Sequence, residues 1–80
     1  MSVSEGKKVI LLTSPRCPKC VRAKELLRDE GIKFREVLVT TDEGLEIGVK
    51  YRLTHVPALI AGERIYVGVE EIKSFIRARG

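Results

Sequence analysis

The sequence predicts an α/β domain in which a four-stranded mixed sheet is flanked by three helices. Short apolar segments typical of strands alternate with segments whose apolar residues recur at helical spacing, in the order βαβ, α, ββα. A strand–helix–strand crossover makes a parallel pair, whereas a tight turn between two strands makes an antiparallel hairpin. The sheet is therefore expected to contain both kinds of pairing.

The first strand is predicted over residues 7–13, whose unbroken apolar run is typical of a central strand buried on both faces. A helix follows. Pro18 suits the first helical turn, where its missing N–H removes no hydrogen bond, and Gly31 suits the left-handed conformation that ends a helix. The apolar stripe between them consists of Cys20, Ala23, Leu26 and Leu27.

The second strand is predicted over residues 32–39, and a short helix follows it. Thr40 and Glu43 match a capping box, which marks a helix start. Gly44 and Gly48 weaken this helix by about 1 kcal/mol each relative to alanine. Its expected apolar stripe consists of three residues spaced four apart, Leu45, Val49 and Leu53.

A hairpin and a last helix complete the pattern. Strands are predicted over residues 57–61 and 64–67, joined by a tight turn at Gly62-Glu63. The stripe of the last helix consists of Val69, Ile72, Phe75 and Ile76.

Length and composition predict one soluble globular domain over residues 1–80, with 44% hydrophobic and 32% charged residues. No apolar run approaches the roughly 18 residues that span a bilayer. The polar segment 1–8 lacks the apolar core of a signal peptide. We therefore expect a cytoplasmic protein with no membrane partner.

The chain carries a net charge of +4, and its basic excess is concentrated in residues 16–35. A positive field of this kind attracts acidic partners and favours an ionised thiol. Nucleic-acid binding is not predicted, because aromatic residues that could stack on bases make up only 5% of the chain.

The chain has two cysteines, Cys17 and Cys20, and both stand where the first strand gives way to the first helix. Unpaired N–H groups and the positive end of the dipole at a helix N-terminus stabilise a thiolate, the reactive form of cysteine. Cys20, one turn further along, can attack a mixed disulfide formed at Cys17. In the cytoplasm such a pair indicates redox or metal chemistry rather than a structural cross-link.

Metal binding is the main alternative. One chain offers two thiols and a single histidine, His55, which falls short of the four ligands of structural zinc. Two chains together could hold zinc or an iron–sulfur cluster through four thiolates. A third interpretation, two inert buried cysteines, is disfavoured by Pro18 and by the flanking cations Arg16 and Lys19, which indicate an exposed loop.

Cys17-Pro18-Lys19-Cys20 at a strand–helix junction, followed by Val56-Pro57 before the third strand, resembles the glutaredoxin branch of the thioredoxin superfamily. The resemblance covers essentially the whole chain and implies a thioredoxin fold. It implies that Cys17 is the nucleophile and Cys20 the resolving thiol. It further implies that Pro57 is cis and faces the cysteines, and that Val56 offers backbone groups to an extended substrate.

Three departures from the family concern glutathione. Ser14 stands where glutaredoxins typically have lysine, and His55 stands where they usually have threonine before Val-Pro. The segment 68–71, Gly-Val-Glu-Glu, keeps only part of a glutathione-binding motif. A carboxylate could still bind near Gly68 and Val69 at a helix N-terminus, but the two glutamates oppose it. The chain is equally similar to small glutaredoxin-shaped proteins that behave as thioredoxins.

The expected protein is a monomeric thiol–disulfide oxidoreductase for protein disulfides, an electron carrier whose Cys17–Cys20 disulfide makes any other cofactor unnecessary. Its electron donor is expected to be a thiol or flavoprotein reductase. His55 has two interpretations, a proton shuttle beside the thiolate or a loop residue without chemical duty, and the second is favoured. The residues expected to contact substrate are Arg16, Pro18, Lys19, His55, Val56, Pro57, Gly68 and Val69.

Overall fold

The computed structural model describes residues 9–79, in which seven elements follow one another in the predicted order. They are β1 (Val9–Thr13), α1 (Pro18–Asp29), β2 (Arg35–Leu38), α2 (Asp42–Tyr51), β3 (Ala58–Ala61), β4 (Arg64–Val67) and α3 (Val69–Arg79). The polar segment 1–8, including the predicted start of the first strand at residue 7, lies outside the described residues.

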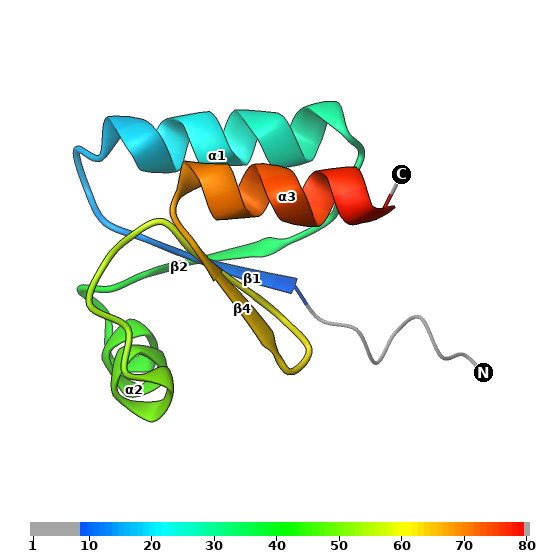
Figure 1. Cartoon of the computed structure of the whole chain (residues 1–80). Coiled ribbons are helices and arrows are strands. Elements are labelled where there is room, and N and C mark those ends of the chain that lie inside the picture. Colours follow the sequence, from blue (N-terminus) through cyan, green and yellow to red (C-terminus); the bar gives the residue numbers. More distant parts are fainter. Residues whose placement is uncertain (1–8, 80) are drawn as a thin grey trace.

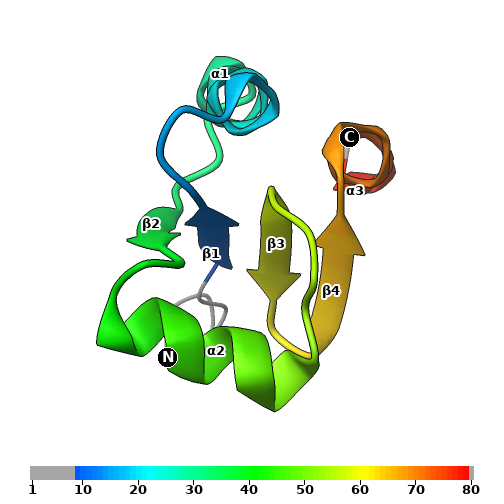
Figure 2. The same cartoon turned by 90° about the vertical axis from the view of Figure 1, so that its left-hand side faces the viewer.

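The strands form one mixed sheet in the order β2-β1-β3-β4. β1 pairs parallel with β2 and antiparallel with β3, and β4 pairs antiparallel with β3. Helices α1 and α3 lie side by side on one side of the sheet and α2 lies on the other (Figures 1 and 2). This arrangement confirms the predicted mixed sheet and the thioredoxin fold. Within the described residues, no helix has the length and apolar character needed to cross a membrane.

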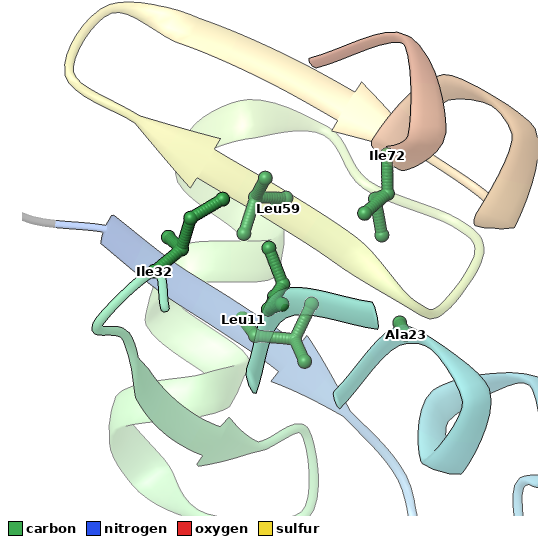
Figure 3. Packing of buried hydrophobic residues seen from close by; sticks show 6 residues of the cluster. Leu11, Ala23, Ile32, Leu59 and Ile72 are labelled. Atoms are coloured by element: carbon green, nitrogen blue, oxygen red, sulfur yellow. The ribbon is translucent and has the colours of Figure 1, made fainter. Parts of the chain in front are cut away.

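The core has two layers, one on each face of the central strand. Leu11 and Leu12 are neighbours on β1 and point to opposite faces, and both are almost fully buried, as the apolar run predicted. The layer under α1 and α3, drawn in Figure 3, consists of Leu11, Ala23, Leu27, Ile32, Leu59 and Ile72. The layer under α2 consists of Leu12, Val37 and Ala58, flanked by partly buried residues such as Ile47 and Leu53.

The second strand is shorter than the predicted 32–39, because the residues at its predicted start belong to the end of α1 and the loop after it. Gly31 has a φ of 71°, which confirms it as the residue that ends the helix. The N–H of Ile32 donates to the Leu27 carbonyl at 3.0 Å, so this group is used by the helix end instead of the sheet. Ile32 is buried in the core, but pairing with β1 begins only at Arg35.

The predicted capping box at Thr40 is wrong by one residue. Thr41 is the N-cap of α2, and its Oγ1 atom accepts a hydrogen bond from the Gly44 N–H at 3.0 Å. The same hydroxyl donates to the Leu38 carbonyl at 2.7 Å. The Glu43 carboxylate pairs with the Arg35 guanidinium instead of reaching back to the cap.

The predicted apolar stripe of α2 does not face the core as a unit. Leu45 is 58% exposed and Val49 is 79% exposed, whereas Gly44 is buried. A Cβ atom at Gly44 would overlap the Leu38 carbonyl oxygen and stand 2.7 Å from the Cα of Val39. The helix therefore packs through its glycine against the backbone that follows β2.

Gly44→Ala is expected to destabilise the protein by about 1–3 kcal/mol, because the methyl group meets backbone that cannot move aside cheaply. Gly48→Ala is the matched control, since a Cβ there meets nothing within 4 Å. It is expected to stabilise the protein by up to about 1 kcal/mol through helix propensity. Urea unfolding followed by circular dichroism measures both, and a Gly44→Ala protein at least as stable as the parent would contradict the packing.

Candidate active site

Cys17 is the N-cap of α1, and its sulfur takes the place of the usual capping oxygen. Its backbone is extended, with φ −113° and ψ 102°, and its Sγ atom accepts a hydrogen bond from the Cys20 N–H at 3.2 Å. Pro18 occupies the start of the helix, as predicted. The thiol is thus held against the N–H groups of the first helical turn, where negative charge is stabilised.

A tight loop connects β1 to this cap. Arg16 has a φ of 58°, a left-handed conformation that is unfavourable for a residue with a side chain. Its side chain is exposed beside the cysteine pair. Ser14 is the first residue of this loop; its side chain hydrogen-bonds Cys17 and its backbone hydrogen-bonds Cys20.

The two thiols, both free, differ in acidity. Burial raises the pKa of Cys17, but hydrogen bonds from the Cys20 thiol, from the N–H groups of Cys20 and Lys19, and from Ser14 bring this pKa below its ordinary value. Cys20 is only 2% exposed, and burial together with the neighbouring Cys17 raises its pKa to about 11. Cys17 is therefore the more acidic thiol, and Cys20 is the one that keeps its proton.

The cationic side chains of the loop contribute less to the pKa difference between the two thiols than the sequence predicts. Arg16 and Lys19 were expected to favour the thiolate as cations, but the largest effects that lower the pKa of Cys17 are hydrogen bonds, and Lys19 acts through its backbone. Hydrogen bonds to the sulfur, the largest of them from the Cys20 thiol, lower the pKa of Cys17 more than side-chain charge does.

A cavity of about 490 Å³ opens beside the two sulfurs. We call it the cysteine cavity; it is lined by Ser14, Pro15, Arg16, Cys17, Pro18, Cys20, Val21, Lys24, Glu36 and Leu38. Sequence reasoning missed Lys24 and Glu36, which form an ion pair of 3.1 Å in it. The position of Lys24 four residues after Cys20 was a usable signal, because such residues share a helix face. The sequence contained no such signal for Glu36, because its position beside the cysteines depends on the pairing of β2 with β1.

A second depression, the α1–α3 groove, has a volume of about 720 Å³ and is lined by the start of α1, the loop before β3 and the start of α3. Six of the residues predicted to contact substrate line it: Pro18, Lys19, His55, Val56, Gly68 and Val69. Arg22, Val67, Glu70 and Lys73 complete its wall and were not predicted. Pro18 lines both the groove and the cysteine cavity, so the two meet at the first turn of α1.

Two predicted contact residues lie elsewhere. Arg16 lines the cysteine cavity and not the groove, and Pro57 is fully buried and lines neither of them. The Val56–Pro57 bond is cis, as the resemblance implied. The Pro57 carbonyl accepts a hydrogen bond from the Gly68 N–H at 2.8 Å, which ties the loop before β3 to the start of α3.

His55 is exposed, and its Nδ1 atom lies 2.9 Å from the Thr54 hydroxyl oxygen. It lines the α1–α3 groove but not the cysteine cavity. This position agrees with the interpretation of a loop histidine, and nothing in it supports a proton shuttle to Cys17. Over residues 9–79, no group of three or more His, Cys, Asp or Glu side chains is arranged to hold a metal ion.

Comparison with known proteins agrees with this site. The glutaredoxin family model matches residues 9–66. A probable thioredoxin from Archaeoglobus fulgidus is 35% identical over 75 residues, which cover 84% of this chain and 82% of that protein. A glutaredoxin from Pseudomonas aeruginosa is 33% identical over 72 residues, which cover 88% of this chain and 86% of that protein.

A solved structure shares the fold. The glutaredoxin-like protein NrdH-redoxin from Escherichia coli superposes with a TM-score of 0.74 at 18% identity, over 91% of this chain and 95% of that chain. The family match, the relatives and the cysteine pair at the first helix lead to one conclusion: this chain belongs to the glutaredoxin family of redox proteins, whose members are generally oxidoreductases.

Proposed function

We propose that this protein is a dithiol–disulfide oxidoreductase that reduces protein disulfides with the Cys17–Cys20 pair. One observation carries the proposal: the Sγ atom of Cys17 caps α1, and Cys20 is buried one turn away with its N–H 3.2 Å from that sulfur. An acidic, accessible thiol beside a protonated, buried one is the arrangement that two-step disulfide exchange requires.

The reaction balances with these two residues alone. The Cys17 thiolate attacks one sulfur of the substrate disulfide, forms a mixed disulfide and releases the other substrate sulfur as a thiolate. Cys20 then loses its proton and attacks the Cys17 sulfur, and the second substrate sulfur leaves. The substrate has gained two electrons and two protons, and Cys17–Cys20 has become a disulfide. The couple itself carries the electrons, so the proposal needs no further cofactor.

The α1–α3 groove supports an extended protein segment as the substrate. It begins at Pro18, next to the reactive sulfur, and continues along Val56 to the start of α3. The two cavities meet at Pro18, so a chain in the groove can present its disulfide to Cys17. Disulfides in proteins are therefore favoured as substrates over disulfides of small molecules.

The first turn of α3 supports a thioredoxin-like role over a glutathione-dependent one. A helix N-terminus attracts anions, but here Glu70 and Glu71 already occupy it. The Glu71 carboxylate accepts the Val67 N–H at 2.8 Å, and Glu70 lines the groove. Two resident carboxylates oppose a ligand that brings its own, as glutathione does. A flavoprotein reductase in the cytoplasm is accordingly the proposed electron donor.

Cys17→Ser is expected to abolish catalysis of insulin reduction by dithiothreitol, with the rate above the uncatalysed background falling on the order of a thousandfold or more, because the nucleophile is gone. Cys20→Ser is the matched variant: it keeps the nucleophile and should accumulate a mixed disulfide at Cys17. Mass spectrometry of the trapped adduct identifies the cysteine involved.

An adduct found on Cys20 in the Cys17→Ser protein would reverse the assigned roles.

Metal analysis and size measurement of the freshly purified parent protein test the alternative of a metal or cluster carrier. A coloured dimer that bleaches on chelation would indicate a carrier of an iron–sulfur cluster shared between two chains. A stable dimer that contains zinc would indicate a zinc carrier, and either result would contradict the proposed oxidoreductase.

Alkylation by iodoacetamide as a function of pH tests the unequal acidity of the thiols. Only thiolates react, so a lowered pKa means that Cys17 reaches its full rate at a lower pH than free cysteine does. Cys20 should remain unmodified until the pH approaches about 11. Peptide mapping assigns each rate, and equal midpoints for the two cysteines would rule out the proposed division of labour.

The electron donor is tested by oxidising the protein and following NADPH consumption in two reconstituted systems. With a thioredoxin reductase, the Cys17–Cys20 disulfide is expected to be re-reduced rapidly. With glutathione and its reductase, the rate should be at least about tenfold lower, which corresponds to about 1.4 kcal/mol. Faster turnover with glutathione would show that Glu70 and Glu71 do not oppose the tripeptide.

A further inference from the structure

The proposed function leaves one step without an explanation. Cys20 must become a thiolate in order to attack the mixed disulfide, yet it is 2% exposed, and burial disfavours a charged sulfur. A buried anion is tolerated when an opposite charge is held close to it. The question is which group supplies that charge.

Lys24 is the cation in position to do so. It follows Cys20 by four residues on α1, so both side chains lie on the same face of the helix. Both line the cysteine cavity, and the positive charge of Lys24 works against the burial that raises the pKa of Cys20. The Lys24 side chain is only 24% exposed, which limits screening by water.

The Lys24 ammonium is held in place by a chain of contacts that reaches the central strand. It lies 3.1 Å from Oε2 of Glu36, and the same oxygen accepts a hydrogen bond of 2.8 Å from the hydroxyl of Thr13. Thr13 is 1% exposed, so this hydroxyl is a fixed point of the core. A lysine on an exposed helix would sample many rotamers, whereas this one is anchored beside the thiols.

Glu36 anchors the lysine and is not itself the base. The hydrogen bond from Thr13 outweighs burial and, with Lys24 and Arg28 nearby, lowers the pKa of the Glu36 carboxyl. A carboxylate of lowered basicity that already accepts from two donors is a poor acceptor for a thiol proton. Its effect on Cys20 is to fix the position of Lys24.

We propose that Lys24, held by Glu36 and Thr13, is a positioning residue that stabilises the Cys20 thiolate as it forms and thereby speeds resolution of the mixed disulfide. The step is Cys17–S–S–substrate plus Cys20–SH giving the Cys17–Cys20 disulfide plus substrate–SH. The departing substrate sulfur takes the proton that Cys20 has lost. The charged and titratable groups that share the cysteine cavity with Cys20 are Arg16 in the loop, Cys17 at the helix cap, Lys24 on α1 and Glu36 on β2.

The two steps can be timed separately with a chromophoric aryl disulfide. Attack by Cys17 releases the first coloured thiol, and attack by Cys20 on the resulting mixed disulfide releases the second. Lys24→Gln removes the charge but keeps a donor for Glu36, and Lys24→Arg keeps the charge. Lys33→Gln is the control, because Lys33 is exposed and follows the opposite end of α1, a helix about 18 Å long.

At neutral pH, Lys24→Gln should slow the second release by about three- to tenfold, the effect of raising the pKa of one thiol by about one unit. The first release should be unchanged. Lys24→Arg and Lys33→Gln should behave like the parent protein. The deficit of Lys24→Gln should shrink as the pH rises toward about 11, where Cys20 ionises without help.

A deficit that is equal at every pH would mean that Lys24 has only a structural role, and an unchanged second release would overturn the inference outright. Either result leaves the proposed function intact, provided that the parent protein releases both thiols. Release of only the first thiol by the parent protein would instead contradict the dithiol mechanism itself.

Discussion

The hydrogen bond from the Cys20 N–H to the Sγ atom of Cys17 is the contact on which the rest of the site depends. It is a helix cap and an activating contact at once: the donor that begins α1 also stabilises negative charge on the sulfur. Because the cap fixes both cysteines to the same helical turn, one thiol is turned toward solvent and the other into the core. Reactivity at this position is therefore inseparable from the folding of the helix.

The sheet fixes the position of this cap through the buried strand β1. β1 lies between β2 and β3, and its two neighbouring leucines, Leu11 and Leu12, anchor it in both core layers. The loop that leaves β1 is thereby held at both of its ends, by the buried strand and by the helix. The same strand ends in Thr13, so the support of the cap and the support of Lys24 come from one piece of backbone.

Much of this could be predicted from the sequence where the signals are local. The element order, the hairpin and the stripes of α1 and α3 follow from periodicity, and the position of Cys17 follows from Pro18 and the apolar run before it. The errors arise where two local signals compete. Ile32 has strand character, but its N–H is taken by the end of α1. Thr40 and Thr41 both suit a cap, and the hydrogen bond to Leu38 selects the second.

Other features depend on contacts between distant segments. The exposed positions of Leu45 and Val49 follow from the fit of Gly44 against the backbone at Leu38, which no periodicity reveals. The contact between Thr13 and Glu36 requires the register of β1 against β2. Such pairings are fixed by packing on both faces of the sheet, so they become visible only once the chain is folded.

The two outer strands of the sheet, β2 and β4, are each four residues long and each begin with an arginine, Arg35 and Arg64. Short, charged margins of this kind discourage the addition of a strand from another molecule, a common route to aggregation. The two sheet edges of this protein, which has an accessible thiol at Cys17, are thus protected against pairing with other molecules. The two margins of the sheet are therefore poor places for an extended segment of another chain to pair.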